Sequence, residues 1–282
     1  AAKLTKSSRP MLVDVKITDW CDAGCGFCYQ GSTTKGEHAK KQSIESLLYN
    51  LGQLEVFEVA LGGGEPTEHP HFIEILESAR MNHIVPNFTT KSLKWLRDDK
   101  LRDKVLGLIG SFAFSVDSVY DTQPLAAAVL WHSIPQHKVS FQVIDGVVEE
   151  SAFEAILRGS AASGIRTTLL GYKDTGRGAR YGRTNKVATN WVKVVQKLHA
   201  EKVWFNLAVD TEVVRQYEKD LKKMGVSETL FHREEGKFSM YADMVKNRVG
   251  PSSYCAESEY VANPREDGYM AEDWLAETYL KF

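Results

Sequence analysis

The stretch CDAGCGFCY at residues 21–29 places three of the chain's four cysteines on one short segment with the spacing C-x3-C-x2-C. Residues 11–18, MLVDVKIT, come just before it and alternate apolar and polar side chains, which predicts a strand that ends near the cysteines. Soft cysteine sulfur is the usual ligand of iron–sulfur clusters, at short, motif-like spacings. Cys21, Cys25 and Cys28 are therefore candidate ligands for three irons of a cuboidal cluster, whose remaining iron would be open to a substrate or cofactor.

A second motif, LGGGEP, occupies residues 61–66. Together the two motifs resemble those of the radical S-adenosylmethionine (radical SAM) family, whose signature C-x3-C-x-aromatic-C is completed here by Phe27. In that family a Gly-Gly-Glu-Pro segment follows the second strand and contacts the methionine amino group of SAM. The resemblance implies a 4Fe-4S cluster held by Cys21, Cys25 and Cys28, with SAM bound to the open iron. It also implies an enzyme that cleaves SAM to a 5'-deoxyadenosyl radical, which takes a hydrogen atom from the substrate.

The resemblance further suggests which residues contact SAM. Glycines at 62–64 would let the backbone approach the methionine closely, and the charge of Glu65 suits the SAM ammonium group. Phe27 could pack by the adenine and Tyr29 could line the same pocket, or both could simply cover the cluster. Hydroxyls and a carboxylate just past the ends of predicted strands could bind the SAM carboxylate or ribose, with capping of the next helix as the alternative. The expected cofactor-binding residues are thus Phe27, Tyr29, Gly62, Gly63, Gly64, Glu65, Thr89, Thr90, Ser115 and Asp117.

Two other interpretations of the cysteines stay open. A structural zinc site needs four ligands, so Cys255 or a histidine such as His38 would have to complete it. A disulfide with one remaining thiol is the other. Four cysteines without a paired framework or a signal peptide do not indicate a secreted protein, and residues 1–10 are expected to be a loose lead-in.

Composition limits the function classes. The 282 residues are 43% hydrophobic and 26% charged, which is enough to bury a large globular core. A net charge of −2 gives no overall attraction to nucleic acid or to an anionic membrane. No window approaches the length of an apolar membrane span. Reduced cysteines and an oxygen-sensitive cluster both predict a cytoplasmic protein.

Strand-like and helix-like segments alternate along most of the chain. Six such units in succession predict a parallel sheet with crossover helices, an α/β fold. The family resemblance implies the partial (β/α)6 TIM-like barrel, with chemistry at the C-terminal ends of the strands. The predicted strands cover residues 11–18, 56–61, 84–88, 111–116, 138–144 and 166–172. The predicted helices cover residues 44–54, with Ser43 as N-cap, then 71–82, 92–104, 124–132, 150–162 and 187–200.

The last third of the chain has a different pattern. We divide the chain into the lead-in, a radical SAM core at residues 11–209 and a C-terminal extension at residues 210–282. The extension is predicted to contain a helix at 212–224, a β-hairpin at 237–243 and 248–254, and a final helix at 270–280, packed on the core. It resembles the extensions that carry auxiliary clusters in peptide-modifying radical SAM enzymes, but Cys255 is its one cysteine. Cys255 could return a hydrogen atom to a substrate radical, ligate a second cluster with other partners, or be a buried apolar residue.

A glycine- and arginine-rich segment follows the predicted strand at residues 166–172. Its cations could bind a carboxylate, a phosphate or nucleic acid, or could simply be solvated, and Lys173 is the one expected to face the cavity and contact substrate. The predicted substrate is a peptide or a polar small molecule, with epimerisation or cross-linking as candidate outcomes. A flavodoxin- or ferredoxin-type electron donor is expected. A nucleotide- or tRNA-modifying enzyme is the alternative within the family, and a zinc- or cluster-bearing binding protein without turnover is the alternative outside it.

Overall fold

The computed structural model describes residues 6–282. These residues form two compact units. We call residues 6–111 together with 235–282 the N/C unit, and Phe112–Glu234 the middle unit. The first half of the predicted lead-in, residues 1–5, lies outside the described residues. The remainder is attached to the N/C unit, because Ser7 N donates to Lys237 O at 3.1 Å and Ser7 Oγ lies 2.7 Å from the Tyr279 hydroxyl.

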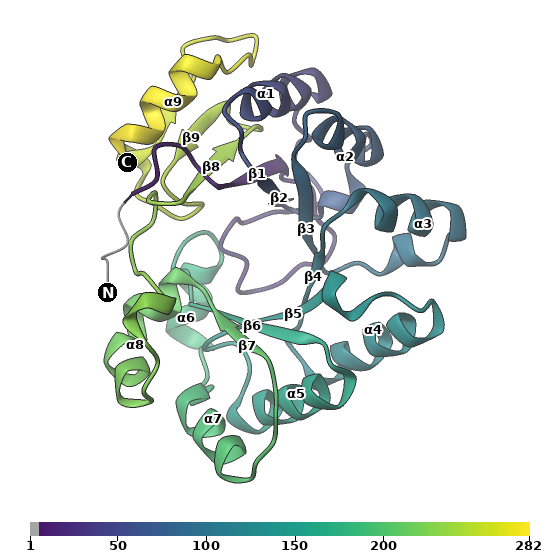
Figure 1. Ribbon diagram of the computed structural model, residues 1–282, viewed down its shortest axis with the longest axis vertical. Helices are drawn as coiled ribbons and strands as arrows, with labels where there is room; N and C mark the ends of the chain where they lie inside the picture. Colours follow the sequence, from purple (N-terminus) through teal and green to yellow (C-terminus); the bar gives the residue numbers. More distant parts are fainter. Residues whose placement is uncertain (1–5) are drawn as a thin grey trace. The chain divides into compact units, whose positions relative to one another are not determined.

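The N/C unit contains parallel strands joined by helices (Figure 1). Its strands follow the order β10-β9-β8-β1-β2-β3. They are β1 (Leu12–Thr18), β2 (Glu58–Gly63), β3 (Val85–Thr90), β8 (Ser239–Asp243), β9 (Arg248–Gly250) and β10 (Val261–Ala262). The helices are α1 (Lys41–Gln53), α2 (Phe72–Met81), α3 (Asp99–Leu108) and α9 (Glu272–Lys281).

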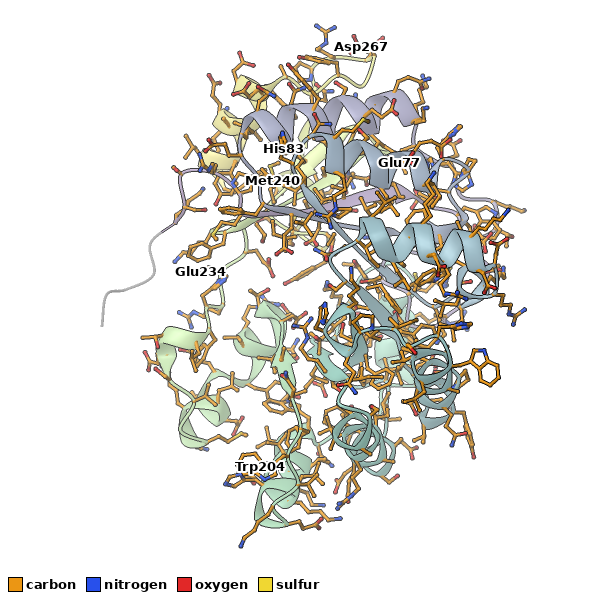
Figure 2. All side chains as sticks on the ribbon, turned by 45° about the vertical axis from the view of Figure 1, so that its right-hand side comes forward. Glu77, His83, Trp204, Glu234, Met240 and Asp267 are labelled. Carbon is orange, nitrogen blue, oxygen red and sulfur yellow. The ribbon has the colours of Figure 1, made fainter. Side chains whose placement is uncertain are left out.

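The C-terminal hairpin continues the sheet of the N/C unit. Strand β8 pairs with β1 in parallel, and β9 pairs with β8 antiparallel. Met240 of β8 lies opposite Val13 of β1 and is fully buried (Figure 2). The second strand of the hairpin ends at Gly250, earlier than predicted, because Pro251 has no N–H with which to extend the ladder. Cys255 therefore follows the hairpin by a short loop.

The middle unit repeats the alternation. Its strands follow the order β4-β5-β6-β7, all parallel, with α4, α5 and α7 along one side (Figure 1). The strands are β4 (Phe112–Ser115), β5 (Val139–Ile144), β6 (Arg166–Leu170) and β7 (Leu207–Val209). The helices are α4 (Val119–Trp131), α5 (Glu150–Ser163), α6 (Gly178–Thr184), α7 (Trp191–Ala200) and α8 (Thr211–Lys223). The predicted α/β class is confirmed, whereas the predicted domain boundaries stay a prediction.

Several helix starts differ from the prediction for local reasons. Helix α1 begins before Ser43, which is buried inside the helix instead of capping it. Helix α3 begins only at Asp99, because the side chain of Asp98 accepts the Leu101 N–H and fixes the cap there.

Helix α4 begins five residues before Pro124, because Ser118 and Asp121 form a capping box. Helix α7 begins at Trp191, since the Thr189 hydroxyl accepts the Gly146 N–H at 2.8 Å and donates to Val148 O, which keeps residues 187–190 out of the helix. Helix α6 was not predicted. Among the described residues, no helix combines the length and the apolar character needed to cross a membrane.

Candidate functional site

The three clustered cysteines lie on a loop that is closed at its base. Strand β1 delivers the chain to Trp20, which forms a parallel bridge with Thr33. Cys21 N donates to Thr33 O at 3.0 Å, and Asp19 N donates to Glu37 O at 2.8 Å. Inside the loop, Cys28 N donates to Cys25 O at 3.3 Å. The segment from Cys21 to Cys28 is thus a tight, backbone-bonded loop at the C-terminal end of β1, and we call it the cysteine loop.

The three thiols are half-exposed and close enough to influence one another. Burial raises the pKa of the Cys21 thiol, and the nearby Glu65, Cys25 and Cys28 raise it further by charge repulsion, while a hydrogen bond with the Ala23 backbone opposes them. None of the four cysteines forms a disulfide in the described part of the chain. Within residues 6–282, no group of three or more His, Cys, Asp or Glu side chains is arranged to hold a metal ion. A single metal ion needs ligands that converge on one point, whereas in an iron–sulfur cluster each thiolate binds a separate iron atom.

The glycine run packs against the backbone that leads into the cysteine loop. Gly64 N donates to Thr18 O at 2.7 Å, and Glu65 N donates to Trp20 O at 2.8 Å. A Cβ on Gly64 would lie 2.0 Å from Trp20 O, and one on Gly63, whose φ is +112°, would lie 2.2 Å from Thr18 O. Gly63 and Gly64 are therefore required by packing inside the protein. At Gly62, in contrast, a Cβ would meet no described atom within 4 Å.

Glu65 joins the ends of β2 and β3. Its side chain is 3% exposed. Oε1 accepts the hydroxyls of Thr67 at 2.6 Å and Thr90 at 2.7 Å, and Oε2 accepts the Lys91 N–H at 2.9 Å. Burial raises the pKa of Glu65, and these hydrogen bonds oppose that shift. The structure thus gives Glu65 and Thr90 a bracing role, and their predicted contacts with SAM stay predictions. Thr89, which is also predicted to bind SAM, projects to the face of β3 opposite to that of Thr90.

A buried ionic network, which sequence reasoning missed, holds the residues on either side of the cysteine loop. Lys16 of β1 is 4% exposed, and its Nζ lies 2.6 Å from Asp19 Oδ1 and 3.6 Å from Asp243 Oδ2. The same Nζ donates to Gln30 Oε1 at 3.3 Å, and Gln30 Nε2 donates to the Tyr241 hydroxyl at 3.3 Å. The sequence signal is a lysine in a strand whose neighbours are apolar, but nothing in the sequence indicates its partners.

The loop that contains Cys255 contacts Tyr29, the residue that directly follows the cysteine loop. The Tyr29 hydroxyl, next to Cys28, lies 3.1 Å from Ser253 Oγ. The Cys255 thiol is half-buried and shares a hydrogen bond with Tyr260. Burial raises the pKa of this thiol, which keeps the proton on sulfur. Phe27 is half-exposed on the cysteine loop itself.

The candidate zinc ligand His38 belongs to a group of histidines beside the glycine run. His38 Nδ1 lies 2.9 Å from Thr18 Oγ1, and the ring centroids of His38 and His69 are 5.2 Å apart. His69 Nε2 lies 3.0 Å from Ala39 O, and its Nδ1 accepts the His71 N–H at 3.1 Å. Since the carbonyl of Ala39 can only accept, His69 is the neutral tautomer with its proton on Nε2. Both nitrogens of His69 are occupied in bracing the segment before α2.

Comparison with known sequences decides the family. The sequence model of the radical SAM superfamily matches residues 15–159, just over half of the chain. The chain belongs to the radical SAM superfamily. This superfamily consists of enzymes that use a 4Fe-4S cluster and SAM, so the predicted enzyme class and cofactors are confirmed at that level. The match includes the cysteine loop, the glycine run and Thr89 to Asp117.

Individual relatives are more distant. The chain is 30% identical over 87 residues to the mycofactocin maturase MftC of Mycobacterium ulcerans (strain Agy99), which covers 30% of this chain and 23% of the relative. The same enzyme of Mycobacterium tuberculosis (strain ATCC 25618 / H37Rv) is also 30% identical over 87 residues, covering 30% of this chain and 22% of the relative. The matched part therefore spans less than a quarter of the length of these relatives.

Solved structures show the fold. Streptococcus suis SuiB bound to the precursor peptide SuiA superposes with a TM-score of 0.63 at 15% identity, covering 88% of this chain and 60% of SuiB. The structure of anSMEcpe with bound AdoMet and the Cp18Cys peptide gives a TM-score of 0.63 at 13% identity, covering 97% of this chain and 82% of anSMEcpe. These similarities confirm the predicted partial-barrel fold of radical SAM enzymes.

The residues of the N/C unit fit the radical SAM cofactors. Cluster ligation needs thiolates. Burial raises the pKa of Cys21, and repulsion from Glu65, Cys25 and Cys28 raises it further; iron cations bound there would offset that repulsion. Cys21, Cys25 and Cys28 lie on one loop. The backbone edge at Gly62 is open, since no described atom lies within 4 Å of the position that a Cβ on Gly62 would take. The donor set and the open edge lie at the C-terminal ends of β1 and β2, where such folds carry chemistry.

The middle unit holds the other predicted radical SAM contacts. Ser115 ends β4, and Asp117 N donates to Asp121 Oδ2 at 3.0 Å. The residue that caps α4 is Ser118, so Ser115 and Asp117 are not its N-cap. Lys173 follows β6 and is half-buried. Sequence reasoning missed a buried carboxylate at the end of β5, Asp145, which accepts the Tyr217 hydroxyl at 2.7 Å.

Proposed function

We propose that this chain is a radical SAM enzyme that removes a hydrogen atom from a carbon of a peptide substrate. The observation that carries the proposal is the closed cysteine loop, with the glycine run packed on the backbone that leads into it. The structural similarity supports a peptide substrate, because SuiB and anSMEcpe were both solved with bound peptides. The mycobacterial relative is a maturase by name, which also supports this proposal.

In this proposal, each element of the N/C unit has a defined task. Cys21, Cys25 and Cys28 hold the cluster, and Gly62 offers backbone to the methionine end of SAM. Glu65, locked by Thr67, Thr90 and Lys91, fixes the edge on which Gly62 lies. When bound and reduced, the two cofactors supply a 5'-deoxyadenosyl radical that abstracts hydrogen. The protein orients the reactants and excludes water around them.

We also expect a separate flavodoxin- or ferredoxin-type protein to deliver the electron. Such donors and reduced thiols coexist in the cytoplasm, which is where we propose that the enzyme acts.

SAM cleavage tests the proposed function. Protein reconstituted anaerobically with iron and sulfide should release 5'-deoxyadenosine from SAM when dithionite is added, as measured by liquid chromatography and mass spectrometry. A variant with serine at all three loop cysteines should release none, while Cys255→Ser should retain a substantial part of the activity. Wild-type protein that takes up only zinc, or that holds a cluster yet leaves SAM intact, would show that the chain is a binding protein.

We further propose that Cys255 returns a hydrogen atom to the substrate radical, which gives epimerisation. Its thiol is protonated and half-buried, and Ser253 of its loop contacts Tyr29, the residue that directly follows the cysteine loop. The S–H bond breaks as the new C–H bond forms, and the resulting thiyl radical regains an electron from the external donor and a proton from solvent.

Deuterium labelling tests this role. In deuterated water, the product of wild-type turnover on the peptide substrate should carry one solvent-derived deuterium. Cys255→Ala should still consume SAM but lose that deuterium, and unchanged incorporation would exclude Cys255 as the donor.

A further inference from the structure

The segment between β6 and α7 of the middle unit carries an unusual excess of positive charge. We call residues 173–186, which include α6, the α6 segment. It contains Lys173, Arg177, Arg180, Arg183 and Lys186 against the single acid Asp174. No Asp or Glu occurs from residue 175 to residue 200. The charge is therefore not balanced locally along the sequence.

Folding neutralises part of this stretch and leaves the rest exposed. Lys193 and Lys197, on α7, reach Glu150 at 2.6 Å and Glu154 at 2.8 Å. By contrast, Arg180, Arg183 and Lys186 are exposed and have no acidic partner within the residues that the structure describes. Other exposed cations of the middle unit, such as Lys222 and Arg233, form ion pairs.

The exposed cations stand on a well-anchored backbone. Buried Tyr172 donates its hydroxyl to Gly178 O at 2.6 Å, and the Tyr181 ring stacks on it with a centroid separation of 6.5 Å. Lys186 Nζ lies 4.7 Å from the centroid of the same Tyr172 ring. Arg180 and Arg183 are three residues apart on α6, so their side chains leave from one face of the helix. The α6 segment therefore presents a fixed cationic surface instead of a mobile tail.

This surface follows the C-terminal end of β6, the edge at which folds of this kind bind their substrates. The one aromatic residue of the α6 segment, Tyr181, stacks on buried Tyr172, whereas proteins that bind single-stranded nucleic acid offer exposed aromatic rings for base stacking. The overall charge of −2 also gives no general attraction to RNA. Acidic side chains on a peptide are the simplest complement to three exposed, separated cations.

We propose that Arg180, Arg183 and Lys186 bind acidic residues of the peptide substrate, so that the enzyme selects acidic peptides. This inference rests on the proposed function, in which the substrate is a peptide. Exposed ion pairs are individually weak and screened by salt, so three of them together change affinity by about tenfold. Their contribution is to choose and align the substrate.

Fluorescence anisotropy of the reconstituted holoenzyme tests the proposal. The probe is a fluorescein-labelled twelve-residue peptide containing four glutamates, compared with the same peptide containing glutamine at those positions. The acidic peptide should bind more tightly at low salt and lose that advantage as salt rises. The triple variant Arg180→Gln, Arg183→Gln, Lys186→Gln should bind it about tenfold more weakly.

A matched variant controls for net charge. Arg166, Lys202 and Lys219 are exposed cations of the same unit without an acidic partner among the described residues, and their replacement by glutamine changes the charge equally. This control should keep wild-type affinity, and circular dichroism should show both variants folded. Equal loss in the control, or equal binding of the glutamine peptide, would overturn the proposal. So would a single-stranded RNA that binds wild-type protein more tightly than the acidic peptide and loses its affinity in the first variant.

The two hypotheses fail separately. Peptide affinity is measured without turnover, and SAM cleavage by wild-type protein is measured without peptide. Peptide selection without 5'-deoxyadenosine would refute the proposed function alone, and cleavage without selection would refute only the acidic preference.

Discussion

Replacing Lys16 with methionine tests whether the buried ionic network carries stability in the N/C unit. The ammonium group lies 2.6 Å from Asp19 Oδ1 and 3.6 Å from Asp243 Oδ2, and Lys16 is only 4% exposed. Methionine keeps most of the volume of the side chain but removes its charge. Asp243, which is 2% exposed, would then retain the Lys246 N–H at 3.0 Å and Arg248 Nε at 3.7 Å.

The expected cost follows from the burial of the partner that is left behind. Removing one member of a buried ion pair costs about 3–5 kcal/mol, because the remaining charge stays desolvated. Since Arg248 still faces Asp243, we expect a value near the lower end, about 3 kcal/mol. The double replacement Lys16→Met with Asp243→Leu removes both charges, so it should recover at least half of that loss.

Urea unfolding measures these differences as shifts of the midpoint at constant m. A surface pair of the same type provides the control, since Lys41 Nζ lies 3.6 Å from Glu45 Oε1 on α1 with both side chains about one-third exposed. Lys41→Met should cost about 0.5 kcal/mol or less. If Lys16→Met costs no more than this control, or if the double variant loses as much as the two single variants added together, the network does not act as described.

Three further predictions concern the surroundings of the cysteine loop. Gly64→Ala should destabilise the protein by about 3 kcal/mol and reduce its iron content after reconstitution, because a Cβ there would lie 2.0 Å from Trp20 O. Gly62→Ala is the control and should unfold like wild type. Equal urea midpoints for the two variants would contradict this prediction. Burial lowers the pKa of His69, so its stabilising effect is complete above the unfolded value of about 6.5 and is lost as the pH falls through the folded pKa. The difference in unfolding free energy between wild type and His69→Gln should therefore shrink below pH 6.5, and a difference that grows on acidification would reverse the sign. Cys28→Ser should abolish the absorbance and paramagnetic resonance signals of the reconstituted cluster, whereas Cys255→Ser should preserve them; loss of both signals in the second variant would make Cys255 a ligand.

The parts of the site that could be predicted from sequence are those encoded locally. The alternation in residues 11–18 predicted β1, and the cysteines directly after it had to lie at its C-terminal end. The glycine run, residues 62–64 at the C-terminal end of β2, is predicted in the same way, from the apolar strand segment that comes just before it. Because the two strands are parallel neighbours, both motifs had to meet at one edge of the sheet. Helix starts are less well predicted, because several residues near each start can cap a helix. Pro124 predicts the start of α4, but the helix is capped by Ser118 and Pro124 lies inside it.

The roles within each motif could not be predicted, because they depend on what fills the space around them. A glycine run indicates that side chains are excluded, but a cofactor and a neighbouring backbone exclude them equally well. The structure separates the two cases, since Thr18 O and Trp20 O occupy the Cβ positions of Gly63 and Gly64, and no described atom approaches that of Gly62. Glu65 is similar: its charge suits an ammonium group, yet both carboxylate oxygens are held by hydroxyl and backbone donors of the protein.

The pairing of β8 with β1 gives the C-terminal extension a structural role. Sequence alone shows a hairpin with too few cysteines for an auxiliary cluster, and a degenerate module would be the natural interpretation. In the structure β8 lies next to β1 in parallel register, Asp243 reaches Lys16, and Tyr241 reaches Gln30 of the segment that follows the cysteine loop. Removing the extension would expose the edge of β1 and leave Lys16 with one carboxylate, that of Asp19. The extension therefore has a physical role in supporting the cysteine loop that does not require a second cluster.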